Sequence, residues 1–118
     1  MSKSATITEK GEVMNKKITK KFIDPVTPGE LLSEEFLIPL GLTKYRIAKE
    51  IGVPAQRIGE IVAGRRAITA DTDLRLCKYF GLSTGYWLRV QNQYEMEITR
   101  RKIQTQLDGI IPINRAGR

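Results

Sequence analysis

Four side chains at the start of one short predicted helix carry groups that can read the edges of DNA bases. The helix is predicted from Pro54 to Ala63, and its first turns present Ala55, Gln56, Arg57 and Glu60. In the major groove a methyl group suits thymine, an amide can pair with adenine, a guanidinium can reach guanine or a phosphate, and a carboxylate can accept from cytosine. A carboxylate near phosphates is unfavourable, so a salt bridge from Glu60 to Arg57 is an equal alternative to a base contact.

Basic residues on either side of this recognition helix are suited to the phosphate backbone of DNA. Lys44 lies at the predicted start of the preceding helix, where a backbone amide and an ammonium can both hold a phosphate. Arg65 and Arg66 follow the recognition helix and are expected to bind the phosphate backbone of DNA. The window 44–66 contains six basic and two acidic residues, a net charge of +4, whereas the window 28–43 carries −3. For Arg57, Arg65 and Arg66 the alternative is a solvated charged face.

The spacing of small and apolar residues over the same stretch is typical of a helix-turn-helix unit. With Lys44 as the first position, Ala48 is fifth, where the two helices cross, and Gly52 is ninth, in a turn that requires a positive φ. Ile58 and Ile61 are fifteenth and eighteenth, where the second helix packs on the core. An ordinary helical hairpin is the alternative, but it does not explain why positive charge is concentrated here. The pattern therefore predicts that the recognition helix enters the major groove of double-stranded DNA.

Capping residues, apolar stripes and glycines predict an all-α fold of five helices. The helix starts are placed by Thr27 with Pro28, and by Thr43, Pro54, Thr69 and Ser83. The helix ends are placed by Gly41, Gly52, Gly64, Gly81 and Gly109, with the last helix running to about Leu107. The fourth helix is expected to bury Leu74, Cys77 and Phe80, and the fifth to pack Leu82 against Trp87.

Three segments are predicted along the chain: a flexible basic arm over residues 1–26, the helical domain over 27–95, and a helical extension with a tail over 96–118. Met14 is either the natural start of the protein or an internal residue of the arm. The tail after Gly109 is apolar for a chain end, and we expect it to dock on a partner or on the domain itself. Within the domain, Arg75 is expected to form an intramolecular ion pair or hydrogen bonds, with the acidic residues of the first helix as candidates.

Several functional classes are excluded by what the sequence does not contain. It has no histidine and one cysteine, which excludes histidine-based acid–base catalysis, Cys/His zinc sites and an internal disulfide. No apolar run approaches the ~20 residues that span a bilayer, and no apolar stretch follows the basic N-terminus as in a signal peptide. Glu34 and Glu35 are adjacent and diverge around a helix, so they do not form a catalytic pair. We therefore expect a cytoplasmic protein that is not an enzyme and has no cofactor, metal or membrane partner.

Three stretches are specific enough to compare with known families. They are Pro28 to Leu32, Ile61 to Thr69, and the set Arg75-Leu76, Phe80-Gly81, Tyr86-Trp87-Leu88 and Gln91 with Tyr94. Together they resemble the HigA/VapI-type antitoxins, a branch of the XRE helix-turn-helix family related to phage repressors. The resemblance extends from Thr27 to about Glu95 and implies a five-helix, lambda-repressor-like DNA-binding domain. Asp73, Arg89 and Glu95 depart from the usual alanine, asparagine and aspartate of this family.

The resemblance implies a DNA-binding antitoxin of a type II toxin–antitoxin system. Such a protein represses its own operon as a homodimer on a palindromic operator, and it neutralises a HigB-like toxin that cleaves mRNA. Two alternatives stay open: a stand-alone XRE-family transcriptional regulator without a toxin partner, and a protein-interaction module that has lost DNA binding.

A two-fold dimer also follows from the small size of the reading unit. One helix-turn-helix contacts a few base pairs, and pairing two places the recognition helices about 34 Å apart, one turn of DNA. The predicted dimer interface lies on the fifth helix, where Trp87, Gln91, Tyr94 and Ile98 recur at i, i+4, i+7 and i+11. The alternative is that these side chains belong to the core of a single subunit.

Overall fold

The computed structural model describes residues 25–114, which contain helices and no strand. The predictions for residues 1–24, including the role of Met14, lie outside the described residues. The elements in chain order are α2 (Pro28–Leu31), η1 (Leu32–Leu37), α3 (Ile38–Leu40), α4 (Lys44–Ile51), α5 (Ala55–Val62), α6 (Ala70–Phe80) and α7 (Tyr86–Asp108). Because α2, η1 and α3 follow one another without a gap, they form one helical run, and the all-α, five-helix prediction is confirmed.

Three of these helices begin after a threonine cap and end at a glycine in the left-handed conformation, as predicted. Each capping side chain accepts a hydrogen bond from the N–H of the third residue after it, which satisfies a donor that has no partner inside the helix. The capping residues are Thr27, Thr43 and Thr69. The same helices end at Gly41, Gly52 and Gly81, whose φ values are 67°, 74° and 71°. Residues with a Cβ rarely adopt this backbone conformation.

The first helical run contains a π-helical segment that the sequence pattern does not predict. Over Leu32–Leu37 the hydrogen bonds widen by one residue, and the N–H of Ile38 donates to the carbonyl of Ser33, five residues earlier. Pro39 accounts for this widening, because in a regular helix a proline ring clashes with the carbonyl four residues earlier and leaves it without a donor.

The core lies where the helices meet around Trp87. This side chain is fully buried, and its ring centroid lies 5.0 Å from that of Phe36, 5.1 Å from Tyr86 and 6.5 Å from Phe80. Tilted and edge-on aromatic pairs of this kind add stability beyond the area that they bury. The other buried apolar residues are Leu32, Leu37, Ile47, Ala48, Ile51, Ile58, Ile61, Ile68, Leu76 and Cys77.

The buried face of α6 differs from the predicted one. Leu74 is 53% exposed, whereas Leu76 is buried, and Cys77 is buried as predicted. The inward face of α6 begins with two polar residues, Thr72 and Asp73, which are 2% and 1% exposed. An apolar pattern cannot locate a face that begins with polar side chains. The prediction therefore placed Leu74 on the buried face of α6, although Leu74 lies on its exposed face.

The start of α7 is also corrected, because the helix begins at Tyr86 and Ser83 is not its cap. The N–H groups of the N-cap Gly85 and of Trp87 and Leu88 in the first turn donate instead to the buried carboxylate of Asp73, at 2.7, 2.8 and 3.2 Å. A carboxylate satisfies N–H groups that lack a helical partner and is favoured by the positive end of the helix dipole. Asp73 therefore fixes where α7 begins.

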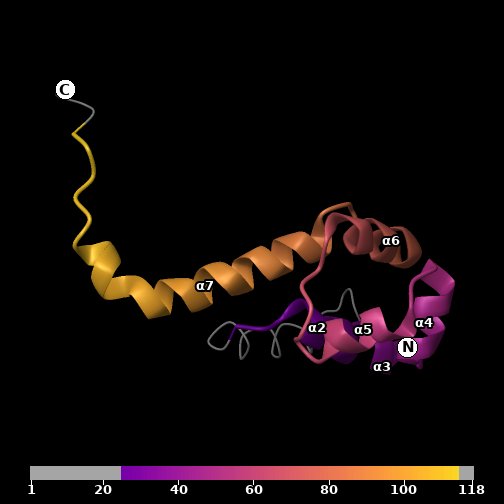
Figure 1. Ribbon diagram of the computed structural model, residues 1–118. Coiled ribbons are helices and arrows are strands. Elements are labelled where there is room, and N and C mark those ends of the chain that lie inside the picture. Colours follow the sequence, from indigo (N-terminus) through magenta and orange to yellow (C-terminus); the bar gives the residue numbers. More distant parts are fainter. Residues whose placement is uncertain (1–24, 115–118) are drawn as a thin grey trace.

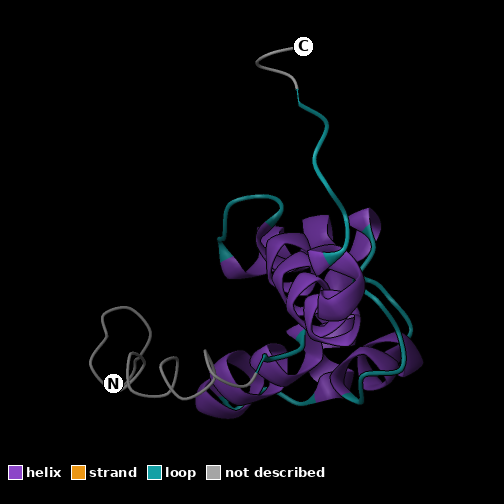
Figure 2. Cartoon of the chain, turned by 90° about the vertical axis from the view of Figure 1, so that its left-hand side faces the viewer, coloured by secondary structure: helices purple, strands orange, loops and turns teal. Residues whose placement is uncertain are grey.

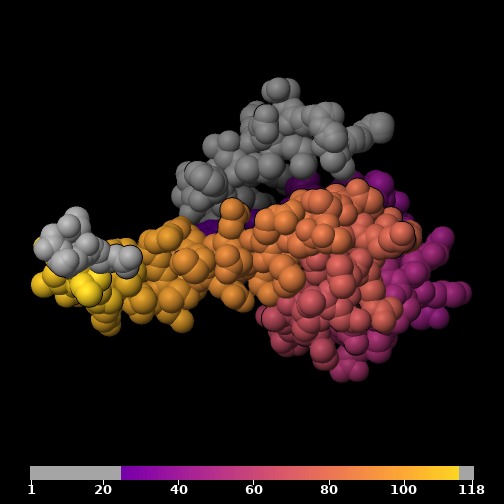
Figure 3. Space-filling view, turned by 90° about the horizontal axis from the view of Figure 1, so that it is seen from above, coloured from indigo at the N-terminus to yellow at the C-terminus, as the bar shows by residue number. Residues whose placement is uncertain are grey.

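Among residues 25–114, only the first part of α7 packs on the other helices, and the remainder of α7 projects from them (Figure 1). Figure 2, seen from the side toward which α7 projects, shows the other helices grouped behind it, and in Figure 3 α7 leaves the body as an arm.

The helix is kinked at Ile103, where φ is −114° and ψ is 19°. The tail residues Ile110, Ile111 and Ile113 are exposed, so the alternative in which the tail docks on the domain is wrong, and docking on a partner stays a prediction. None of the described helices has the length and apolar content that a membrane span requires.

Candidate nucleic-acid interface

The recognition helix α5 buries one face and presents the other to solvent. Ile58 and Ile61 are 0% and 2% exposed, whereas Ala55 and Gln56 lie on the surface. Pro54 is the N-cap, with an extended ψ of 142°, so the helix begins one residue later than predicted. Of the residues predicted to meet base edges, Ala55 and Gln56 therefore lie at the exposed start of α5, whereas Arg57 and Glu60 are only partly exposed.

Close packing holds α5 against α2 and α4. Ala48 of α4 is 2% exposed, and Gly52 turns the chain between α4 and α5 with a φ of 74°. Gly29 of α2 lies so close to α5 that a Cβ on it would overlap the carbonyl oxygen of Ile61. A glycine at this position lets the two helix backbones approach, and α5 is thereby fixed from two sides.

Three of the predicted site residues form a hydrogen-bonded network on α5 and the loop after it. The carboxylate of Glu60 accepts from Nε2 of Gln56 at 3.0 Å and from Nε of Arg66 at 2.7 Å. The Arg66 guanidinium, followed by the Gln56 amide, holds the pKa of Glu60 below its usual range. Glu60 is therefore ionised at neutral pH. The alternative in which it pairs with Arg57 is wrong, because its cationic partner is Arg66.

Arg57 points toward α6. Its Nη1 donates to the Asp71 carboxylate at 2.9 Å and to Oγ1 of Thr72 at 3.5 Å, and its side chain is 28% exposed. In the chain without DNA the guanidinium is held inside the subunit by this ion pair, and the predicted contact of Arg57 with guanine or a phosphate stays a prediction. Arg57 thereby ties the recognition helix to the first turn of α6.

Arg75 supports the turn of the helix-turn-helix, a role that its place in the sequence does not indicate. Its Nη1 donates to the carbonyls of Ile51 at 2.7 Å and Gly52 at 3.3 Å, where the end of α4 leaves acceptors without helical partners. Its Nε donates to Asp71 at 3.0 Å, so the expected partner on the first helix is wrong. The i, i+4 spacing of Asp71 and Arg75 is the sequence signal for this pair. Arg75, followed by Arg57, holds the pKa of Asp71 below its usual range.

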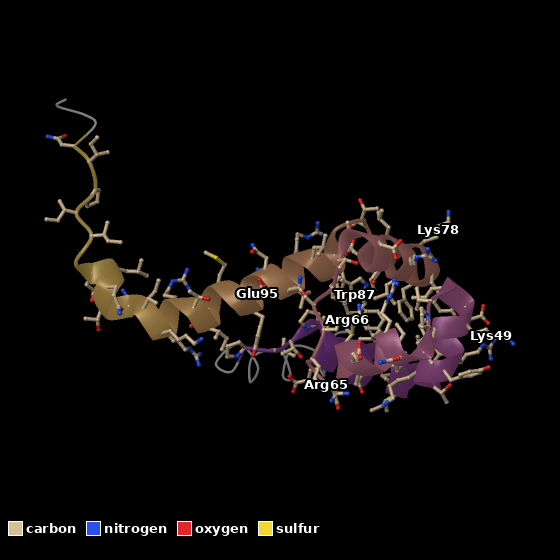
Figure 4. All side chains as sticks on the ribbon, viewed as in Figure 1. Lys49, Arg65, Arg66, Lys78, Trp87 and Glu95 are labelled. Carbon is tan, nitrogen blue, oxygen red and sulfur yellow. The ribbon has the colours of Figure 1, made fainter. Side chains whose placement is uncertain are left out.

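The side chains predicted to bind phosphate are exposed around α5. Lys44 is the first residue of α4, directly after the Thr43 cap, and Arg65 and Arg66 follow the end of α5. Arg65 lies at the edge of the body next to α5 (Figure 4). Arg66 is about half exposed despite its contact with Glu60. Exposed cations near a recognition helix can contact the backbones that border a DNA groove.

Only part of the predicted dimer interface is accessible. Trp87 is 0% exposed and enclosed by other aromatic rings, so it is a core residue and the interface prediction is wrong for it. Gln91 is engaged within the subunit, because its Oε1 accepts from the Ile68 N–H at 2.6 Å and its Nε2 donates to the Ile68 carbonyl at 3.0 Å. Tyr94 and Ile98 are half-buried, and Tyr94 lines a hollow of about 190 Å³ between α2, the loop after α5 and α7. For these two residues the interface stays a prediction.

Comparison with known proteins places this geometry in a family. The sequence matches the helix-turn-helix family over residues 34–87. Virulence-associated protein I of Dichelobacter nodosus is 41% identical over 95 residues, which cover 80% of this chain and 87% of that protein. The chain belongs to the HigA/VapI branch of the helix-turn-helix family.

Two similar antitoxins extend the comparison within the HigA/VapI family. Antitoxin HigA-1 of Vibrio cholerae serotype O1 is 29% identical over 89 residues, covering 75% of this chain and 84% of the antitoxin. The structure of Pseudomonas aeruginosa antitoxin HigA with the higBA promoter has a TM-score of 0.70 and 30% identity, over 76% of this chain and 98% of that chain. The family comprises non-enzymatic helix-turn-helix regulators and antitoxins, which confirms the expectation that the chain is not an enzyme.

Proposed function

We propose that this HigA/VapI-family chain is a sequence-specific DNA-binding antitoxin that represses its own operon through α5. The observation that carries the proposal is the exposed start of α5, together with the exposed cations Lys44 at the start of α4 and Arg65 and Arg66 after the end of α5. An α-helix fits the major groove, and the residues at its start then reach base edges. The promoter DNA in the structure of the similar Pseudomonas aeruginosa antitoxin supports the same use of this fold.

The side chains of this surface divide into two groups by the part of DNA that they contact. Ala55 and Gln56 read bases, because they are exposed on the first turn of α5. Lys44, Arg65 and Arg66 bind phosphates, which sets affinity and its salt dependence and carries no sequence information. Pro54 brings the chain into α5 in an extended conformation, so that the first turn of the helix is the part presented to the groove.

The active form is a homodimer on a palindromic operator. One recognition helix contacts too few base pairs for selective binding, and two of them about one turn of DNA apart double the site. Tyr94 and Ile98 contribute to the dimer interface, since they lie on α7 beyond its buried first turn. The toxin is a HigB-like ribonuclease that cleaves mRNA; its support is the similarity to HigA antitoxins.

A binding titration tests the DNA-binding part of the proposal. Fluorescence anisotropy compares a duplex from upstream of the gene with a scrambled duplex of the same length and composition, at rising salt. We expect binding to the native duplex to be tighter by about a thousandfold or more, with log K falling linearly with log salt. Equal affinity for both duplexes at low salt would overturn the proposal and favour a protein-interaction module.

Affinity capture tests the antitoxin part. The tagged full chain is purified from its native host, and bound proteins are identified by mass spectrometry. We expect a stoichiometric partner encoded beside the antitoxin gene, and we expect the partner to cleave mRNA only when it is separated from this chain. Specific operator binding without such a partner would favour a stand-alone XRE-family regulator.

A further inference from the structure

Glu60 is a carboxylate on a surface proposed to face phosphates, and its contacts explain why it is compatible with that surface. It lies one helical turn after Gln56 on α5, and its side chain is 24% exposed. A lone carboxylate at this place would repel the DNA backbone. The ion pair with Arg66, at 2.7 Å, offsets that charge, so Glu60 does not have to make a favourable contact with DNA itself.

The second oxygen of this carboxylate fixes the orientation of the Gln56 amide. An ionised carboxylate accepts hydrogen bonds and cannot donate them, and only the NH₂ end of a glutamine amide is a donor. The NH₂ group of Gln56 must therefore face Glu60, and it lies 3.0 Å from Oε2. The other end of the amide, Oε1, points away from Glu60 on an exposed side chain.

The two possible orientations of a glutamine amide match different bases in the major groove. With the oxygen leading, the amide accepts from the amino group of adenine or cytosine, and its second NH₂ proton remains for N7 of adenine. With the NH₂ group leading, it would donate to the acceptors of guanine or thymine. Holding the NH₂ group of Gln56 on the protein side therefore favours bases that carry an amino group in the major groove.

We propose that Glu60 is a specificity-determining positioning residue, which holds Gln56 with its carbonyl oxygen toward the base edge and so selects adenine or cytosine against guanine and thymine. Arg66 belongs to the same unit, because it holds the first oxygen of Glu60 and balances its charge. The inference rests on the proposed function, since Gln56 meets a base only if α5 enters the major groove.

A site selection followed by titrations tests this role. The full wild-type chain first selects its preferred site from a randomised duplex library, and the base pair that meets Gln56 is identified as the one at which Gln56→Ala loses discrimination. Duplexes carrying each of the four bases at this position are then titrated with the wild type, Glu60→Ala, Gln56→Ala and the double variant. We expect the wild type to prefer adenine or cytosine, and Glu60→Ala to lose about tenfold of that preference. In the Gln56→Ala background, Glu60→Ala should leave the ratios between duplexes unchanged.

Two controls separate positioning from charge and from folding. Removal of a negative charge alone would tighten binding to all four duplexes by the same factor, in both backgrounds. Glu50→Ala removes a carboxylate from another exposed arginine pair, with Arg46 on α4 at 2.7 Å, and should not change base preference. Circular dichroism and the thermal midpoint of each variant establish that it is folded.

The outcomes distinguish this inference from the proposed function. The inference is overturned if the selected base is guanine or thymine, if no position loses discrimination in Gln56→Ala, or if Glu60→Ala keeps the wild-type ratios. A wild-type chain that selects a site but prefers guanine or thymine there, or keeps its ratios in Glu60→Ala, contradicts the inference alone. If no position loses discrimination in Gln56→Ala, the assignment of Gln56 to base reading is overturned as well. A wild-type chain that enriches no sequence overturns the proposed function, and the inference with it.

Discussion

Replacement of Asp73 by alanine should destabilise the folded chain by about 3 kcal/mol. Asp73 is 1% exposed and accepts hydrogen bonds from the N–H groups of Gly85, Trp87 and Leu88 around the start of α7, at 2.7, 2.8 and 3.2 Å. The N–H of Trp87 is buried, and leaving it without a partner costs about 1–3 kcal/mol. The N–H groups of Gly85 and Leu88 are partly buried and can turn to water, so each adds about 0.5–1 kcal/mol, the lower range for loss of a helix cap.

The desolvation of a buried carboxylate is the effect that opposes this loss. Replacing a whole buried polar network by apolar groups can be neutral or even stabilising. In Asp73→Ala, however, only the acceptor is removed, and the backbone donors of α7 remain desolvated without a partner. The net effect should therefore be destabilising, and large beside a total stability of about 5–15 kcal/mol for a domain of this size.

Urea unfolding followed by tryptophan fluorescence measures this effect, because Trp87 is the single tryptophan of the chain and is buried. Asp71→Ala is the matched control: it removes the same group from the same helix at a site that is 54% exposed, where ion pairs contribute little. Asp73→Asn keeps one acceptor oxygen and should fall between Asp73→Ala and the wild type. If Asp73→Ala cost no more than Asp71→Ala, the carboxylate would not be what holds the start of α7.

Three further predictions concern the contacts that hold α5 in place. Gly29→Ala should cost at least about 2 kcal/mol in urea unfolding, because its Cβ overlaps the carbonyl oxygen of Ile61; Gly59→Ala, on an open side of α5, should be neutral or slightly stabilising, and similar losses from both would contradict this. Arg75→Ala should cost about 1–2 kcal/mol, because it removes hydrogen bonds to the carbonyls at the helix-turn-helix turn. It should also weaken binding to matched and mismatched duplexes by the same factor; an effect on one duplex alone would be contrary to this role. The pKa of Asp71, lowered in the folded state chiefly by Arg75, means that its stabilising effect is present above the ordinary value of 3.8 and is lost as the pH falls through the lowered value. The free energy of unfolding, measured from about pH 6 down to about pH 2, should therefore fall less steeply in Asp71→Asn than in the wild type. Parallel curves for the two proteins would contradict this prediction.

Helix ends that depend on local chemistry could be predicted from the sequence. The caps at Thr27, Thr43 and Thr69 act over three residues, so the residue type and its place before an apolar stripe are sufficient. The start of α7 could not be predicted in this way. Its N–H groups are satisfied by Asp73, 12 to 15 residues earlier, and that contact exists only after α6 and α7 have packed.

The candidate site shows the same division between local and long-range contacts. The exposure of Gln56 follows from the inward positions of its neighbours on α5, which the helix-turn-helix spacing indicates. The direction of Arg57 depends on Asp71, 14 residues later, and the role of Arg75 depends on Ile51, 24 residues earlier. The pattern could not decide whether Trp87 lies in the core or at a dimer interface, because an apolar stripe has the same spacing whether it faces the core of its own subunit or a partner.

Whether α5 reads bases in the major groove can be decided with two variants and one set of duplexes. The wild type, Gln56→Ala and Arg65→Ala are titrated against the selected duplex and its single-base variants at fixed salt. Gln56→Ala should lose about 1–3 kcal/mol of discrimination at one base pair, whereas Arg65→Ala should weaken every duplex by the same factor and reduce the salt slope by about 0.9. Equal losses from both variants on every duplex would contradict the assignment of α5 to base reading.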